Sequence, residues 1–217
     1  MTSLPTPCVC LITDRRVAGS SEALVRAVDL ALAGGIDVVQ LREKGLSTTG
    51  LTSLARRLRD ITAGRALLIV NGSLEVALAV EADGVHLPED AMSIAQAQRP
   101  PSLLIGRSMH SVNGAVAAVR DGTDYVQAGA VFATESHPGA ASAGLSLIES
   151  MTAAVSMPVV GVGGVTHANT GAVIAAGAGG VAVIRAVLAA PDPRAAAQAL
   201  RQAVDAAWAQ RAVQAIR

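Results

Sequence analysis

Eight short runs of β-branched and other apolar residues constrain the fold of this chain more than any other feature. Each run is followed by a stretch with the spacing of one helix face, such as 22–33 and 51–62. Alternating strands and helices form parallel sheets, and eight strands can close into a barrel. The sequence therefore predicts an α/β fold, a (β/α)8 TIM barrel, as a single domain over 1–217. The expected strands are 8–13, 37–41, 66–70, 84–87, 103–108, 124–128, 158–162 and 180–184.

A weak internal repeat supports this interpretation. The segments AGGIDVVQL, EADGVHL, RDGTDYVQA and AGAGGVAVI each place glycine between a helical stretch and the next expected strand. Glycine there adopts the left-handed conformation that ends a helix. The length of 217 residues lies near the lower end for such barrels, and a hydrophobic share of 51% is ample for their core.

The charge and the few aromatic residues exclude several classes of partner. Seventeen Lys and Arg balance seventeen Asp and Glu, and aromatic residues make up 1% of the chain. Nucleic-acid and membrane partners are therefore not expected. The most apolar long stretch, 172–190, is glycine-rich and carries Arg185.

The two cysteines and the start of the chain indicate a reducing compartment. Cys8 and Cys10 fall on one face of an expected strand, where a bridge between them would be strained. They are interpreted as small buried residues, with a redox or metal pair as the less favoured alternative. The start MTSLPTPCVCLITD lacks the order of a signal peptide, so we expect a cytoplasmic protein.

The active face of such a barrel lies at the carboxyl ends of its strands. His86 lies within an expected strand, where a core histidine and a ligand-binding one are equally plausible. His167 suits the start of a helix, and Asp14 and Ser73 suit helix caps. The polar residues that follow expected strands include Asp14, Arg42, Glu43, Lys44, Asn71, Glu89, Asp90, Ser108, His110, Thr134, Ser136, His137 and Arg185.

The segment GVGGVT, after the seventh expected strand, is typical of phosphate binding. Gly163 and Gly164 let backbone amides approach a phosphate, and the following helix adds its positive end. Ile184 and Arg185, after the eighth strand, are expected to complete the phosphate site. The alternative is that this pair of glycines serves only packing.

The segment QLREK, from Gln40 to Lys44, is the second motif. Alternation along a strand sends Gln40 and Arg42 the same way, and Lys44 extends the positive charge onto the loop. Such a cluster suits a diphosphate or another multiply charged group. The alternative is a surface pairing of Arg42 with Glu43 and no ligand.

On these residues the chain resembles the thiamine phosphate synthase/TenI superfamily along nearly its whole length. The matching stretches are QLREK, VNGSLEVAL, ADGVHLPED, GRSMHS, DYVQAGAVFAT, GLSLIE and PVVGVGGVT. The resemblance implies a barrel that handles the thiazole phosphate and pyrimidine diphosphate halves of thiamine. The synthases join these halves with Mg²⁺ and displace pyrophosphate. Gln40, Arg42 and Lys44 match the residues that hold their pyrimidine diphosphate.

The chain departs from the synthases at three loops. They carry an aspartate directly after the asparagine that ends the third strand, whereas Asn71 is followed here by Gly72. Their GQxD after the fourth strand is PED here, at 88–90. Their threonine-lysine pair after the sixth strand is replaced by Ser136 and His137. Loss of a metal carboxylate and of a lysine should weaken a step that builds up phosphate charge.

Asn71 with Gly72, the LP after the fourth strand and GRSMHS place the chain closer to the TenI branch. That branch is known for thiazole tautomerase activity, which needs a positioned base and neither metal nor cofactor. Its histidine follows the glycine of the sixth strand, where this chain has Ala130 after Gly129. His137 is therefore the expected base, with His110 next.

The main hypothesis is a TenI-type tautomerase acting on a thiazole phosphate. A thiamine phosphate synthase with Mg²⁺ is the alternative, and a non-catalytic regulator that binds thiamine phosphate is the third. All three imply a small phosphorylated ligand, and the resemblance implies a homodimer. The loop 132–144 is the expected lid. Besides the motif residues, Asn71, Ser108, Thr134 and Ser136 are expected to contact the substrate.

Overall fold

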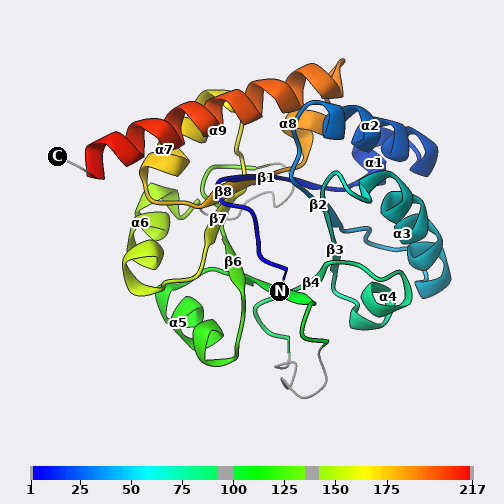
Figure 1. Cartoon of the computed structure of the whole chain (residues 1–217), viewed down its shortest axis with the longest axis horizontal. Helices are drawn as coiled ribbons and strands as arrows, with labels where there is room; N and C mark the ends of the chain where they lie inside the picture. Colours follow the sequence, from blue (N-terminus) through cyan, green and yellow to red (C-terminus); the bar gives the residue numbers. More distant parts are fainter. Residues whose placement is uncertain (1, 92–99, 135–141, 216–217) are drawn as a thin grey trace.

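Eight parallel strands form a closed barrel in the computed structural model, which describes residues 2–91, 100–134 and 142–215 (Figure 1). Each strand pairs with the next in the chain, and β8 pairs with β1. The predicted barrel is confirmed, and every strand end lies within one residue of its expected position. The strands are β1 (Cys8–Ile12), β2 (Val38–Leu41), β3 (Leu67–Asn71), β4 (Gly84–Leu87), β5 (Leu104–Met109), β6 (Tyr125–Ala128), β7 (Val159–Val162) and β8 (Gly180–Val183).

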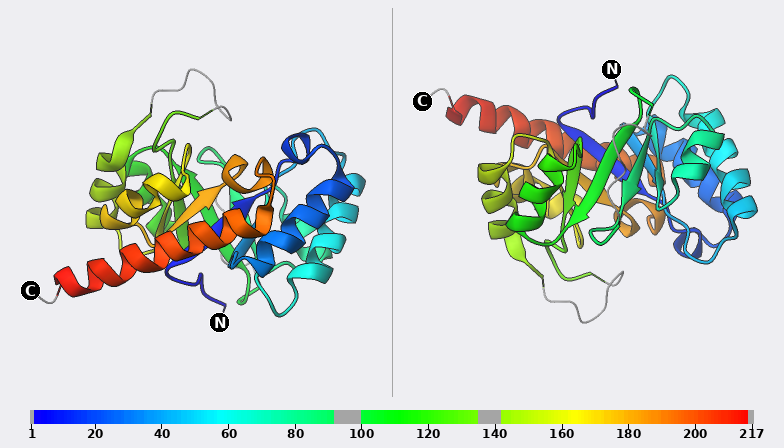
Figure 2. Two further views of the ribbon diagram at one scale, coloured as in Figure 1. Left: turned by 90° about the horizontal axis from the view of Figure 1, so that it is seen from above. Right: turned by 90° about the horizontal axis from the view of Figure 1, so that it is seen from below.

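Helices surround the barrel on the outside (Figures 1 and 2). Four of them begin at a serine whose hydroxyl accepts a hydrogen bond from the amide three residues on: Ser20, Ser47, Ser73 and Ser111. Such caps satisfy amides that a helix start leaves without a partner. The described helices are α1 (Arg15–Ala18), α2 (Ser21–Ala33), α3 (Thr48–Thr62), α4 (Leu74–Ala79), α5 (Val112–Arg120), α6 (Gly144–Ala154), α7 (His167–Ala175), α8 (Arg185–Leu188) and α9 (Pro193–Ala215).

The core has two layers, because successive side chains of a strand point inward and outward. The outer layer packs between strands and helices. The inner layer fills the barrel and includes Leu4, which precedes β1. Cys8 and Cys10 belong to this inner layer as free, buried thiols, as the sequence predicted. Burial raises the pKa of Cys8 to about 12, so its thiol stays protonated.

Glycines end the helices at three of the four repeats. Gly35, Gly122 and Gly177 have positive φ angles of 99°, 72° and 108°. The fourth repeat is different: Glu81 takes the left-handed position with φ 51°, and Gly84 begins β4 instead. The repeat therefore predicted all four turns. In the fourth, it predicted the wrong residue for the left-handed position.

The long helix α9 packs across α7 and α2 (Figure 2). Arg201 binds Asp37 at 2.6 Å, and the same carboxylate oxygen accepts the amide of Val9 at 2.7 Å. This joins α9 to the start of β1. No helix among the described residues has the length and apolarity needed to cross a membrane.

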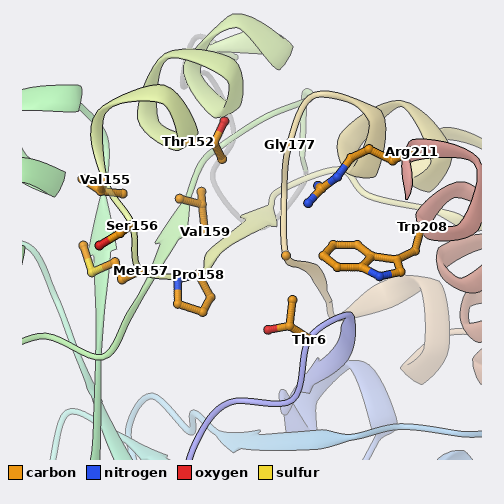
Figure 3. Close-up of a pocket in the computed structure, with 11 residues that line it drawn as sticks. Thr6, Thr152, Val155, Ser156, Met157, Pro158, Val159, Gly177, Trp208 and Arg211 are labelled. Carbon is orange, nitrogen blue, oxygen red and sulfur yellow. The ribbon is translucent and has the colours of Figure 1, made fainter. Parts of the chain in front are cut away.

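Near its end α9 is held by two further side chains. The guanidinium of Arg211 lies 4.2 Å from the ring centre of Trp208 and donates to the carbonyls of Ile174 and Ala178. Figure 3 shows this pair beside Thr6, on the border of a cavity of about 230 Å³. These contacts cap the carboxyl end of α7, so we assign them a structural role.

Candidate active site

A cleft of about 1140 Å³ opens at the carboxyl ends of the strands. It lies where the fold rule places an active face. Ser136 and His137 lie outside the described residues, and His167 starts α7 without lining the cleft. The expected site residues that line it are Gln40, Arg42, Lys44, Asn71, Ser108, His110, Thr134, Gly163, Gly164, Ile184 and Arg185.

One wall of the cleft carries positive charge after β2. The amide of Arg42 donates to the hydroxyl of Thr13 at 3.0 Å, which fixes the backbone at this point. Glu43 pairs with Arg15 and accepts its amide at 3.1 Å, and its side chain is almost wholly buried. The surface pairing of Arg42 with Glu43 is therefore not formed. Arg42 and Lys44 both line the cleft.

Two glutamines form the floor. The amide nitrogen of Gln127 on β6 donates to the side-chain oxygen of Gln40 on β2 at 2.6 Å across the barrel. Both are buried beside Cys10. Gln127 was not among the expected site residues. The segments DVVQL and DYVQA place glutamine at the same point of the repeat, which is the signal that would have found it.

The glycine motif after β7 is tightly enclosed. Gly163 and Gly164 have φ angles of 95° and 64°, and a side chain at Gly163 would meet Ala130 at 2.7 Å. The helix α7 follows at once and begins with a capping box between Thr166 and Asn169. Gly163 and Gly164 line the cleft. A glycine turn that leads into the start of a helix is typical of an anion site.

His86 lies below the cleft as a buried residue and is hydrogen-bonded to Ser108, which lines the cleft. Its Nδ1 is 3.3 Å from the hydroxyl of Tyr125, and its Nε2 is 2.9 Å from the hydroxyl of Ser108. Burial, and secondarily the charge of Arg42, lowers the pKa of His86 to about 3. The imidazole is therefore neutral at ordinary pH. Of the two interpretations open for His86, the core histidine is the one observed.

His110 is held at the rim of the cleft by Glu89. The imidazole Nδ1 and a carboxylate oxygen are 2.6 Å apart, and the histidine is exposed. Asn71 and Asp90 line the same cleft and offer the oxygen atoms that Mg²⁺ prefers. Within the described ranges no three His, Cys, Asp or Glu residues are grouped to hold a metal ion. The oxygen atoms of Asn71 and Asp90 would therefore supply only part of the ligands of a Mg²⁺ ion in this cleft.

Comparison with known proteins identifies relatives over almost the whole chain. A family model described as thiamine monophosphate synthase matches residues 9–187. A thiamine-phosphate synthase of Methanoculleus marisnigri is 46% identical, covering 92% of this chain and 96% of the relative. One from Chloroflexus aurantiacus is also 46% identical, with 89% and 91% covered.

A solved structure agrees with the sequence relatives. A thiamine phosphate pyrophosphorylase from Pyrococcus furiosus superposes with a TM-score of 0.84 at 37% identity, covering 93% of this chain and 96% of that one. The expectation of a tautomerase is therefore wrong, because relatives at 41–46% identity are named thiamine-phosphate synthases. The differences from the synthases in the loops after β3, β4 and β6 led to the wrong choice of reaction. The predicted closeness to the TenI branch is not confirmed.

Proposed function

The chain belongs to the thiamine monophosphate synthase family, and from this premise we propose that it is a thiamine-phosphate synthase. Its relatives are enzymes, and so is this chain. The proposed reaction joins a pyrimidine diphosphate to a thiazole phosphate. The observation that carries the proposal is one cleft lined both by the cationic pair Arg42 and Lys44 and by the glycines Gly163 and Gly164. Two phosphorylated substrates need two anion sites.

The chemistry is a substitution at the methylene carbon that carries the diphosphate. The thiazole nitrogen supplies the electron pair of the new C–N bond, and the C–O bond breaks. Pyrophosphate leaves with that electron pair, so negative charge grows on the leaving group. Fixed positive charge nearby stabilises this change more than it stabilises the substrate.

We assign the residues of the cleft to the two substrates. Gln40, Arg42 and Lys44 bind the pyrimidine diphosphate. The amides at Gly163 and Gly164, with Ile184 and Arg185, bind the thiazole phosphate. Asn71, Ser108 and Thr134 contact the substrates between these two regions, and His110 faces the leaving pyrophosphate. Ser136 and His137 have no part in this assignment.

Mg²⁺ fits this site chiefly as a partner of the substrate diphosphate. Magnesium sites in enzymes commonly use one or two carboxylates, with phosphate oxygens and water completing the octahedron. Asp90 supplies a carboxylate and Asn71 an amide oxygen from two neighbouring loops of the cleft. When bound, the ion would neutralise charge on the leaving pyrophosphate.

The test is an assay with the purified protein, both substrates and Mg²⁺. We expect thiamine phosphate and pyrophosphate to form in equal amounts. Tautomerisation of the thiazole carboxylate phosphate, measured in parallel, should stay at the uncatalysed rate. Tight binding of the substrates without turnover would contradict the proposed function and return the non-catalytic alternative.

We also propose that the chain forms a homodimer, on the resemblance to its family. Light scattering coupled to size-exclusion chromatography measures the mass directly. A single species near twice 21.8 kDa is expected. A species of 21.8 kDa at all concentrations would contradict it.

A further inference from the structure

Three side chains from three neighbouring strands form a chain of contacts below the cleft. They are His86 on β4, Ser108 on β5 and Tyr125 on β6. His86 and Tyr125 are fully buried, whereas Ser108 is half-buried and lines the cleft. None of the roles assigned above uses Tyr125 or His86.

The strand register explains why these residues meet. His86 is level with Gly106 on β5, and Gly106 is level with Tyr125 on β6. A side chain at Gly106 would collide with the ring of Tyr125, so only glycine lets the ring pass over β5 to reach His86. Ser108 is two residues farther along β5 and points to the same face. The contact is thus built into the barrel.

We propose that Tyr125 and His86 act as positioning residues that fix the direction of the Ser108 hydroxyl, so that it donates a hydrogen bond into the cleft. The direction follows from the order of donors and acceptors. In the part of the chain that the structure describes, His86 is the hydrogen-bonding partner of the Tyr125 hydroxyl. Burying a hydroxyl without an acceptor is unfavourable, so Tyr125 donates to Nδ1.

The rest of the order follows from this first bond. Burial raises the pKa of Tyr125 well above its ordinary value, so the phenol keeps its proton. With Nδ1 accepting and the imidazole neutral, the single imidazole proton is on Nε2. Nε2 therefore donates to the oxygen of Ser108 at 2.9 Å. The hydroxyl proton of Ser108 is left for the cleft.

The consequence concerns the ligand. The atom that meets Ser108 must carry a lone pair, as a ring nitrogen or a phosphate oxygen does, and an amino group there would be disfavoured. This assignment rests on the proposed function: the atom that meets Ser108 belongs to the pyrimidine diphosphate. Two probes separate the two sources: inorganic pyrophosphate, and the pyrimidine alcohol that lacks the diphosphate. The Ser108→Ala variant should weaken binding of only one of them.

The tautomer of His86 tests the relay without any substrate. In a protein with ¹⁵N-labelled histidine at pH 7, long-range proton–nitrogen spectra distinguish an Nε2–H ring from an Nδ1–H ring. His110→Gln and His167→Gln variants, both at exposed sites, remove two signals and help to identify that of His86. We expect the Nε2–H pattern. An Nδ1–H pattern would overturn the proposal whether or not the protein is a synthase.

Kinetics test the coupling among the three residues. Tyr125→Phe keeps the ring and removes the hydroxyl, and we expect kcat/KM to fall about fivefold to tenfold. Ser108→Ala should have an effect of similar size, and Ser108→Thr, which keeps a hydroxyl, should recover most of it. In the Ser108→Ala background Tyr125→Phe should add little, because the hydroxyl that it directs is gone.

A purely structural role for Tyr125 gives a different result. The two substitutions would then be additive in kcat/KM, and this outcome would contradict the relay. Thermal unfolding of each variant checks that it is folded. If the wild type proved inactive as a synthase, the two single variants and the double variant would be compared by calorimetry with pyrophosphate and the pyrimidine alcohol. Additive losses of binding free energy would again contradict the relay.

Discussion

Gly72 is the residue at which the chain differs most plainly from the synthase pattern. It directly follows Asn71 at the end of β3, and its amide donates to the carbonyl of His86 at 2.8 Å. Its φ angle is 80°, and a side chain there would meet nothing within 4 Å. Aspartate tolerates this left-handed conformation better than most residues do. The position therefore has room for the missing carboxylate.

We predict that Gly72→Asp increases the affinity of the enzyme for Mg²⁺. The new carboxylate adds a ligand beside Asn71, so the half-saturating Mg²⁺ concentration should fall roughly threefold to tenfold. Gly72→Asn is the matched control, because it imposes the same backbone conformation without the charge. Equal Mg²⁺ titrations for the two variants would show that position 72 does not contact the metal.

Arg42 gives a second prediction at the scale of one residue. Its neighbour Glu43 is occupied by Arg15, so the guanidinium lines the cleft without that pairing. Arg42→Gln should raise the KM for the pyrimidine diphosphate about tenfold to a hundredfold, since a hydrogen bond to a charged group is lost. Arg56→Gln, on the exposed face of α3, removes the same charge and should leave KM unchanged. A similar KM in both variants contradicts the assigned role.

At the scale of elements, glycine decides how closely α9 packs. Gly34 ends α2, and a side chain there would collide with the carbonyl of Arg194 and meet Ala197 at 2.8 Å. Its φ angle of −90° is open to any residue, so the restriction is one of space alone. Gly171 lies inside α7, and a side chain there would meet Ala207 on α9 at 4.0 Å, an ordinary contact.

Alanine at these two glycines should therefore change stability in opposite directions. Gly34→Ala forces α9 away from α2 and should cost about 1–3 kcal/mol. Gly171→Ala removes backbone freedom from the unfolded chain and should stabilise by about 0.5–1 kcal/mol. Urea unfolding measures both. Stabilisation by Gly34→Ala would show that the helices separate at little cost.

The elements could be predicted from sequence because their signals are local. Short apolar runs place each strand end within one residue of its observed position, and glycine turns support four of the eight strands. Side-chain partners could not be predicted, because they join residues far apart in the chain. The pairing of Arg15 with Glu43, the Gln40–Gln127 contact and the passage of Tyr125 over Gly106 all depend on strand register. The wrong choice of reaction came from weighing single loop residues above similarity over the whole chain.

At the scale of the whole molecule, the buried His86 links folding to pH. Its pKa is about 3 in the folded protein and near 6.5 when the chain is unfolded. Between these values the unfolded chain binds more protons, so stability falls as the pH is lowered from 6.5 toward 3. Asp37 acts in the opposite direction, because burial raises its pKa and folding then favours its protonated form.

We predict that His86 dominates acid destabilisation in this range. The free energy of unfolding should fall by up to about 1.4 kcal/mol per pH unit below pH 6, measured by urea titrations between pH 7 and pH 4. His86→Gln removes the titrating group and should flatten this slope. His167→Gln makes the same substitution at an exposed site and serves as the matched control, with a slope expected to be as steep as in the wild type. If the free energy of unfolding of His86→Gln fell as steeply with pH as that of the wild type, acid unfolding would be assigned to the carboxylates. The barrel interior of the wild type would then tolerate a charged His86.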